Sequence, residues 1–297
     1  MKPAPFKYIA ARFREEALSA KAEHGEEAWF LAGGQSLVPS MNFRLAQPAI
    51  LIDLNPIADL AGVRRHESGL SIGALTRHAA VEHDALIALH QPLIHEAMPF
   101  VAHPQIRNRG TIGGNLSHAD PASEMPAIVL ALGARMRAES TRGGRWVAAE
   151  DFFAGALSTT LEADEMLAEI ELPDLAPGSG TCFMEVSRRR GDFALMGVAA
   201  VVTLDADGTC TDARLTYCGA GDGPLSAGEA AQSLIGRPVA DDSIDEAANL
   251  AQSAIDPLGS NHASPEYQRH LVGVLTRRAL RTASDRARAA HASGRAA

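Results

Sequence analysis

The chain has 297 residues, of which 46% are hydrophobic, and its 36 acidic against 27 basic residues give a formal net charge of -9. A chain of this length and hydrophobicity can bury a large core, in two domains or one large one. The acidic balance argues against a surface built to neutralise nucleic-acid phosphates or anionic lipids, so we expect neither partner.

The chain gives no sign of membrane insertion or of a metal site of its own. Residues 1–6 contain no signal-peptide core and no later apolar run is long enough to span a bilayer, so we expect a cytoplasmic protein. Three cysteines, Cys182, Cys210 and Cys218, are too few and too irregularly spaced for a disulfide framework, a zinc site or an iron–sulfur cluster. We expect them to be reduced thiols.

The N-terminal part reads as a helix followed by two strands. Helix-forming residues fill 10–23 and stop before Gly25. Two apolar runs, 28–32 and 49–54, have the length and composition of strands. Glycines 33–34 end the first of them, so the pattern predicts strand, tight loop, strand.

The next segment predicts a hairpin and several helices. Residues 62–72 alternate around Glu67-Ser68-Gly69 like a hairpin, and Thr76 is a candidate cap for a helix running toward His83. The composition of 84–102 is helical. Residues 108–115 are rich in Gly, Thr and Asn, which predicts an irregular backbone.

A helix over about 121–132 and three short strands should complete the first part of the chain. The strands are expected at 134–139, 145–148 and 165–172. Pro, Gly and Ser gather in 173–180, which we therefore predict to be the linker between two domains.

The segment after the linker predicts a hairpin and helices. Strands at 198–204 and 210–217 flank Asp205-Ala206-Asp207-Gly208, whose Asp and Gly suit a tight turn. The last long helix is expected over 265–286, with Ser264 as its N-cap and proline at its first position.

Two glycine-rich segments follow this framework, at 32–37 (A-G-G-Q-S-L) and at 111–115 (T-I-G-G-N). Glycine allows close backbone approach and can turn successive N–H groups toward an anion. One glycine pair alone is better explained as a tight turn, whereas two together favour a pyrophosphate site. Neither fits the G-x-G-x-x-G fingerprint of Rossmann dinucleotide sites, and 219–224 imitates it only in part.

These segments resemble the motifs of a known family. The patterns A-G-G-x-S-L-x-P at 32–39 and T-I-G-G-N at 111–115, with D-P-A-S-E-x-P at 120–126, are similar to the flavin-binding motifs of molybdenum hydroxylase medium subunits. That family includes aerobic carbon monoxide dehydrogenase and xanthine dehydrogenase. Residues 188–194 (R-R-R-G-D-F-A) and 266–271 (E-Y-Q-R-H-L) resemble further family segments, so the resemblance covers nearly the whole chain.

The resemblance implies an α+β fold and an oxidoreductase subunit. Residues 1–174 would form an FAD-binding domain of the p-cresol methylhydroxylase type, with subdomains of about 1–55 and 56–174. A smaller α+β domain with an antiparallel sheet and helices would follow over 175–297. FAD would relay electrons to an external acceptor, so no catalytic side chain is expected here. The family places [2Fe-2S] clusters in a small subunit and the molybdenum cofactor in a large one, in a dimer of heterotrimers.

The resemblance also implies a set of FAD-binding residues. They are Ala32, Gly33, Gly34, Gln35, Ser36, Leu37, Thr111, Ile112, Gly113, Gly114, Asn115, Asp120, Glu124, Leu167 and Glu185. The two loops would hold the diphosphate, and Asp120 and Glu124 would accept hydrogen bonds from ribityl or adenosine hydroxyls. Leu167 and Glu185 would close the site. The sequence departs from the family at Glu124, where Asp is usual, and at Gln268, where Arg is commoner.

Several alternatives stay open at this point. Asp120 is equally well placed to cap a helix beginning at Pro121, with Glu124 completing the cap. Arg188–Arg190 is either a solvated face or a docking patch, and His118 receives no role. In function, the alternatives are a free-standing FAD-dependent oxidoreductase of the same fold and a non-catalytic assembly subunit. The first needs a cluster of catalytic side chains after the linker and the second predicts broken loops. The sequence offers neither.

Overall fold

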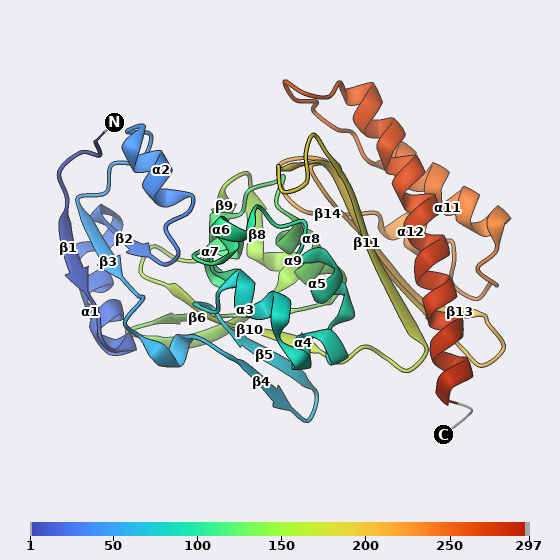
Figure 1. Ribbon diagram of the computed structural model, residues 1–297, viewed down its shortest axis with the longest axis horizontal. Helices are drawn as coiled ribbons and strands as arrows, with labels where there is room; N and C mark the ends of the chain where they lie inside the picture. Colours follow the sequence, from blue (N-terminus) through green and yellow to red (C-terminus); the bar gives the residue numbers. More distant parts are fainter. Residues whose placement is uncertain (1, 295–297) are drawn as a thin grey trace.

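The computed structural model describes residues 2–294, which form three parts in succession along the long axis of the molecule (Figure 1). The N-terminal lobe is a parallel sheet of order β1-β3-β2. Its central strand is buried at all four positions, as an unbroken apolar run favours in a parallel sheet. The elements of this lobe are β1 (Lys7–Ala10), α1 (Arg14–His24), η1 (Gly25–Glu27), β2 (Ala28–Leu31), α2 (Leu37–Asn42) and β3 (Ile50–Asp53).

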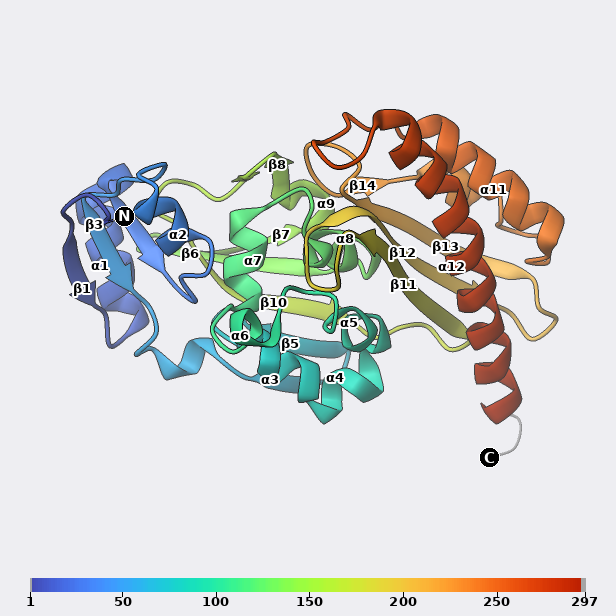
Figure 2. The ribbon, with the colours of Figure 1, turned by 45° about the horizontal axis from the view of Figure 1, so that its top comes forward.

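The middle part is a five-stranded antiparallel sheet of order β4-β5-β10-β6-β7, with most of the helices gathered on one side of it (Figure 2). The strands of this sheet are β4 (Val63–His66), β5 (Gly69–Gly73), β6 (Arg135–Ser140), β7 (Gly143–Ala148) and β10 (Met166–Pro173). A separate two-stranded sheet consists of β8 (Phe153–Gly155) and β9 (Ser158–Thr159), and the 3-10 turn η2 (Ala58–Leu60) precedes β4. Its helices are α3 (His78–His83), α4 (Ala85–His90), α5 (Pro92–Ala97), α6 (Pro104–Arg107), α7 (Ile112–His118), α8 (Glu124–Ala131) and α9 (Ala149–Phe152).

The C-terminal part is a four-stranded antiparallel sheet of order β11-β12-β13-β14. The long helix α12 packs along β11 and β12, and α11 packs against α12 (Figure 1). These elements are β11 (Ser179–Ser187), β12 (Ala194–Leu204), β13 (Cys210–Cys218), β14 (Leu225–Ser226), α10 (Gly228–Gln232), α11 (Asp241–Ala254) and α12 (Pro265–Gly294).

The hydrophobic core of the middle part continues into the C-terminal sheet. Ile128 of α8 belongs to the same buried cluster as Ala199 of β12 and Cys218 of β13. The Thr216 hydroxyl donates to the Ala127 carbonyl at 2.7 Å, and this bond ties β13 to α8 directly. Helix α8 is therefore packed between the helices α5, α7 and α9 of the middle part and the C-terminal sheet.

Many of the predicted elements are present. The α+β class is confirmed, as are the hairpin of β4 and β5, the strands β2, β3, β6, β7 and β10, and the hairpin of β12 and β13. Helix α12 begins at Pro265, and the Tyr267 N–H donates to the Ser264 hydroxyl oxygen at 3.2 Å. Ser264 is thus its N-cap, as predicted. No helix in the described residues combines the length and apolar character needed to cross a membrane.

Other boundaries were predicted wrongly. The first helix begins at Arg14, because Lys7–Ala10 is a strand paired with β3. Thr76 caps no helix, since its hydroxyl donates to the Gly73 carbonyl at 2.6 Å. The helical segment 84–102 is two helices, α4 and α5, which are interrupted at Gln91 before a proline. Strand β11 begins at Ser179, inside the segment predicted to be a linker.

The segment around the second glycine pair also differs from expectation. Residues 112–115 are not irregular but form the first turn of α7. The predicted helix over 121–132 begins only at Glu124. Asp120 stabilises a turn and does not cap a helix. Its side chain accepts from the Ala122 N–H at 2.9 Å and its carbonyl accepts from the Ser123 N–H at 3.0 Å.

Candidate functional site

The fold brings the two glycine segments into contact. A Cβ built on Gly33 would lie 2.4 Å from the carbonyl oxygen of Arg109 and 2.8 Å from the Cα of Gly110. A Cβ on Gly114 would lie 3.7 Å from the Cβ of Ala32. The first segment therefore lies against the backbone of Arg109 and Gly110, just before the second segment, and at Gly33 there is no room for a side chain.

The first segment offers a run of unused hydrogen-bond donors. It crosses from β2 to α2 through Gly34, whose positive φ of 72° glycine adopts without strain. The backbone N–H groups of residues 33–37 donate to no acceptor in the described part of the chain, and the first helical bond runs from Val38 N–H to Gly34 O at 3.1 Å. Gln35 donates its side-chain amide to the Gly33 carbonyl at 3.1 Å. Five consecutive donors are thus available to a ligand.

The second segment uses its donors internally. Four of its N–H groups have acceptors within the protein: Ile112 to Thr76 O (3.0 Å), Gly113 to Ala74 O (2.8 Å), Gly114 to Thr111 Oγ1 (3.0 Å) and Asn115 to Thr111 O (3.0 Å). A Cβ on Gly113 would lie 2.4 Å from that of Ala74. This segment is accordingly a tightly packed wall beside the first loop, and its glycines serve close approach to the sheet.

Helix α7 leads from the glycine segments to α8 (Figure 2). At its first turn the side chains of Asn115 and Ser123 are hydrogen-bonded at 2.8 Å, which joins the start of α7 to the start of α8. Glu124 follows at the first position of α8 and is 4% exposed. Asp120, in the turn between the two helices, is half-buried. The expected ligand-binding residues from the glycine segments to Glu124 therefore lie along a continuous path.

Two carboxyl groups end this path at the boundary between the middle and C-terminal parts. Burial raises the pKa of Glu124 to about 7, with the charge of Asp120 adding to the effect. Burial and the charge of Glu124 raise the pKa of Glu185, on β11, to about 8. Both carboxyl oxygens of Glu185 are buried without a hydrogen-bond partner in the described residues. A Cβ on Gly197 would lie 2.5 Å from Cys218 Sγ and 3.4 Å from Glu185 Cβ.

Leu167 lies apart from the polar path. It is 5% exposed on β10, opposite Ala138, and belongs to the core cluster that contains Ile112 and Leu116 of α7. Its described contacts are with the core beneath α7.

Three polar residues at the glycine segments were missed by sequence reasoning. Asn55 donates to the Ala32 carbonyl at 2.8 Å, and Arg77 donates to Asn55 Oδ1 at 2.5 Å and to the Arg109 carbonyl. Asn55 follows a buried strand and Arg109 directly precedes the second glycine motif. The sequence positions of Asn55 and Arg109 could therefore have pointed to the site, whereas nothing in the sequence around Arg77 does.

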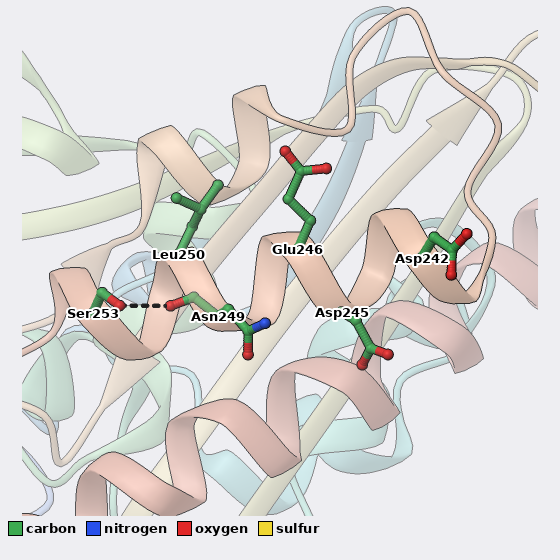
Figure 3. Close-up of a pocket in the computed structure, with 6 residues that line it drawn as sticks. All are labelled: Asp242, Asp245, Glu246, Asn249, Leu250 and Ser253. Carbon is green, nitrogen blue, oxygen red and sulfur yellow. Dashed lines mark hydrogen bonds between the residues drawn. The ribbon is translucent and has the colours of Figure 1, made fainter.

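A separate hollow lies on α11, at the opposite end of the molecule from the glycine segments (Figures 1 and 3). Its lining residues are Asp242, Asp245, Glu246, Asn249, Leu250 and Ser253. Ion pairs of 2.6 Å bind Asp245 to Arg277 and Glu246 to Arg237, so most of its charge is already compensated. Within the described residues there is no grouping of His, Cys, Asp and Glu suited to a metal ion.

A run of free backbone donors against a second glycine loop is the kind of site that receives the diphosphate of a dinucleotide. The arrangement favours a dinucleotide site of non-Rossmann type. The five unpartnered N–H groups of residues 33–37, followed by a path lined with polar groups, fit an extended dinucleotide such as FAD.

Comparison with known proteins agrees with this class. Residues 4–175 match the family described as the FAD binding domain in molybdopterin dehydrogenase, and residues 181–283 match the CO dehydrogenase flavoprotein C-terminal domain. The 6-hydroxypseudooxynicotine dehydrogenase complex subunit alpha of Paenarthrobacter nicotinovorans is 41% identical, over 97% of this chain and 97% of that protein. Caffeine dehydrogenase subunit beta of Pseudomonas sp. (strain CBB1) is 42% identical, over 96% and 97%.

A solved structure is similar throughout. A chain of carbon monoxide dehydrogenase from Hydrogenophaga pseudoflava superposes with a TM-score of 0.93 at 35% identity, covering 96% of this chain and 99% of that one. The chain described here belongs to the family of FAD-binding medium subunits of the molybdenum hydroxylases.

Proposed function

We propose that this chain carries FAD between its glycine segments and relays electrons, taking them from [2Fe-2S] clusters in a partner subunit and passing them to an external acceptor. Bound FAD supplies the redox chemistry, and the protein contributes binding and orientation. The observation that carries the proposal is the run of five unused backbone donors at residues 33–37, held against a second glycine segment.

The residues of the path have different proposed roles. The backbone of residues 32–37 binds the diphosphate, and residues 111–115 form the wall that fixes its position. Asp120 and Glu124 accept hydrogen bonds from the sugar and ribityl hydroxyls. Glu185 brings the C-terminal domain to the far end of the site, and Leu167 supports α7 from below. We place the domain boundary between 174 and 175, with subdomains of about 1–55 and 56–174.

The partners are proposed to be a small iron–sulfur subunit and a large subunit with the molybdenum cofactor, in a dimer of heterotrimers. The names of the relatives support an assembly of several subunits, since they are called a medium chain, a subunit alpha and a subunit beta. Three free, buried cysteines in this chain leave the iron–sulfur clusters to a partner.

We place the choice of substrate outside this chain. Relatives named for 6-hydroxypseudooxynicotine, caffeine and carbon monoxide are 41%, 42% and 36% identical to it. Such different compounds are served by flavoprotein subunits of similar sequence, which supports a substrate site on the large subunit.

The test is purification of the tagged full chain from its native cells under gentle conditions, followed by an absorption spectrum and metal analysis of what co-purifies. We expect FAD, iron and molybdenum together with two further chains. Recovery of a single yellow chain that turns over an organic substrate without a partner would instead establish a free-standing flavoenzyme. Recovery of a colourless assembly would establish a scaffold.

A further inference from the structure

Arg77 connects the two glycine segments. It lies at the N-cap of α3 and its guanidinium donates to the carbonyl oxygen of Arg109 and, at 2.5 Å, to Oδ1 of Asn55. Both acceptors are uncharged. Among the described residues, Arg77 forms no ion pair with a carboxylate, although a half-buried arginine usually does.

Asn55 completes the connection on the side of the first segment. Its side-chain amide donates to the Ala32 carbonyl at 2.8 Å and to Asp53 Oδ1 at 2.5 Å. Asp53 also accepts the hydroxyl of Tyr8, so its carboxylate is already shared. Hydrogen bonds thus run from Ala32, before the first glycine pair, through Asn55 and Arg77 to Arg109, before the second.

The same place carries two guanidinium groups against one nearby carboxylate, that of Asp53, whose charge also acts on Arg77. The Arg109 side chain is exposed and forms no hydrogen bond or ion pair in the described part of the chain. It lies near enough to Arg77 to act on it: burial is the main cause of the lowered pKa of Arg77, and the charge of Arg109 is the next. Two neighbouring cations repel one another, so an anion that binds beside them relieves this repulsion and is bound more favourably.

We propose that Arg77 and Arg109 form the cationic part of the FAD diphosphate site, and that Arg77 also holds the two glycine segments in register through Asn55 and the Arg109 carbonyl. The inference rests on the proposed FAD-binding function and deepens it. The unused N–H groups of residues 33–37 supply directional hydrogen bonds, and the two guanidinium groups supply charge.

Arg109→Ala tests the charge, because an exposed side chain without partners can be removed without harm to the fold. The FAD-free full chain is titrated with FAD, followed by flavin fluorescence, at low and high salt, and ADP is used as a competing probe. We expect about 10-fold weaker binding of both FAD and ADP, a shallower salt dependence and an unchanged unfolding midpoint. Arg64→Ala, which removes one charge at an ion pair of 3.2 Å with Glu169, is the matched control and should bind as wild type does.

Asn55→Ala tests the positioning role, since it breaks the link without a change of charge. We expect weaker FAD binding and a lower unfolding midpoint, with the salt dependence of the wild type. Wild-type affinity and salt dependence in Arg109→Ala would overturn the cationic site, as would a loss of FAD affinity with ADP affinity retained. Unchanged FAD affinity in Asn55→Ala would overturn the positioning role. A wild-type chain that binds no FAD would overturn the proposed function itself, which separates the two failures.

Discussion

Gly33 lies so close to Arg109 that a Cβ on the glycine would be 2.4 Å from the arginine carbonyl oxygen. The φ of Gly33 is not positive, so the need for glycine there comes from the approach of two chain segments and not from backbone conformation. The contact is between backbones, which cannot move aside as the end of a flexible side chain can.

Gly33→Ala should therefore force the two glycine segments apart. We expect a loss of about 1–3 kcal/mol in the free energy of unfolding and a purified protein with much less FAD per chain. The measurements are thermal unfolding and the ratio of flavin to protein absorbance. Gly223→Ala is the control, because nothing lies within 4 Å of its Cβ position, and it should retain FAD. Full retention of FAD by Gly33→Ala would show that the segments yield easily.

Glu124→Gln should alter the dependence of stability on pH in the FAD-free chain. Its pKa is about 7 in the folded protein, above the ordinary value of 4.5. The unfolded chain thus releases this proton first as pH rises, and the stabilisation present below about pH 4.5 is lost on the way to pH 7. In the variant this loss should be smaller by about 2–3 kcal/mol, measured by denaturant unfolding at several pH values.

A comparison variant of opposite sign is Glu165→Gln. Arg145 hydrogen-bonds to Glu165 at 2.7 Å and lowers its pKa, so the ionised form is favoured in the folded protein. That contribution is present above the ordinary pKa and disappears as pH falls. Glu165→Gln should therefore be less stable than wild type at neutral pH, with a difference that shrinks in acid. Parallel pH profiles for the two variants would contradict at least one of the two assignments.

Arg107→Met should destabilise the approach to the second glycine segment. Arg107 is 7% exposed, pairs with Glu82 at 2.8 Å and donates to the carbonyls of Val101 and Ala102 at 3.1 and 2.8 Å. Removal leaves these acceptors without their donor, and we expect a loss of about 3 kcal/mol in unfolding free energy. Arg142→Met, at an exposed ion pair, should change it by less than about 1 kcal/mol. Equal effects in the two variants would count against a structural role for Arg107.

Gln268→Leu should weaken the attachment of α12. Gln268 is 4% exposed; its amide donates to the carbonyls of Leu195 at 2.8 Å and Gly219 at 3.0 Å, and its oxygen accepts from the Gly259 N–H at 3.0 Å. Three backbone groups lose their partner in the variant, so we expect a cost of about 2–4 kcal/mol, seen in denaturant unfolding. Gln105→Leu, at an exposed position, is the control. A stability equal to wild type would mean that water replaces the amide.

The sequence was most informative where local chemistry determines local structure. The turn at Asp205–Gly208 and the Ser264 cap depend on neighbouring residues, so both could be predicted. The strand β1 could not, because Lys7–Ala10 is short and largely exposed and its pairing is with β3, more than 40 residues later in the chain. Strand β11 was partly hidden because Ser179 and Gly180 have the composition of a linker.

The candidate site, too, could be predicted only in part from the sequence. The glycine pairs marked both segments, yet the division of labour between them depends on residues distant in sequence. The carbonyls of Ala74 and Thr76 use the donors of the second segment, while those of the first have no such neighbour. Arg77 joins the segments through bonds to residues 22 and 32 positions away, which a sequence pattern does not reveal.

The position of α8 between the helices of the middle part and the C-terminal sheet has a consequence for synthesis of the chain. One face of α8 packs in the middle part, but the other is covered by β12 and β13, which leave the ribosome later. Until residues 194–218 have been made, buried groups such as Ile128 and the Ala127 carbonyl lack their cover. The nascent FAD-binding half should therefore expose hydrophobic surface to which chaperones can bind. It should reach its final stability only once the C-terminal sheet has folded against it.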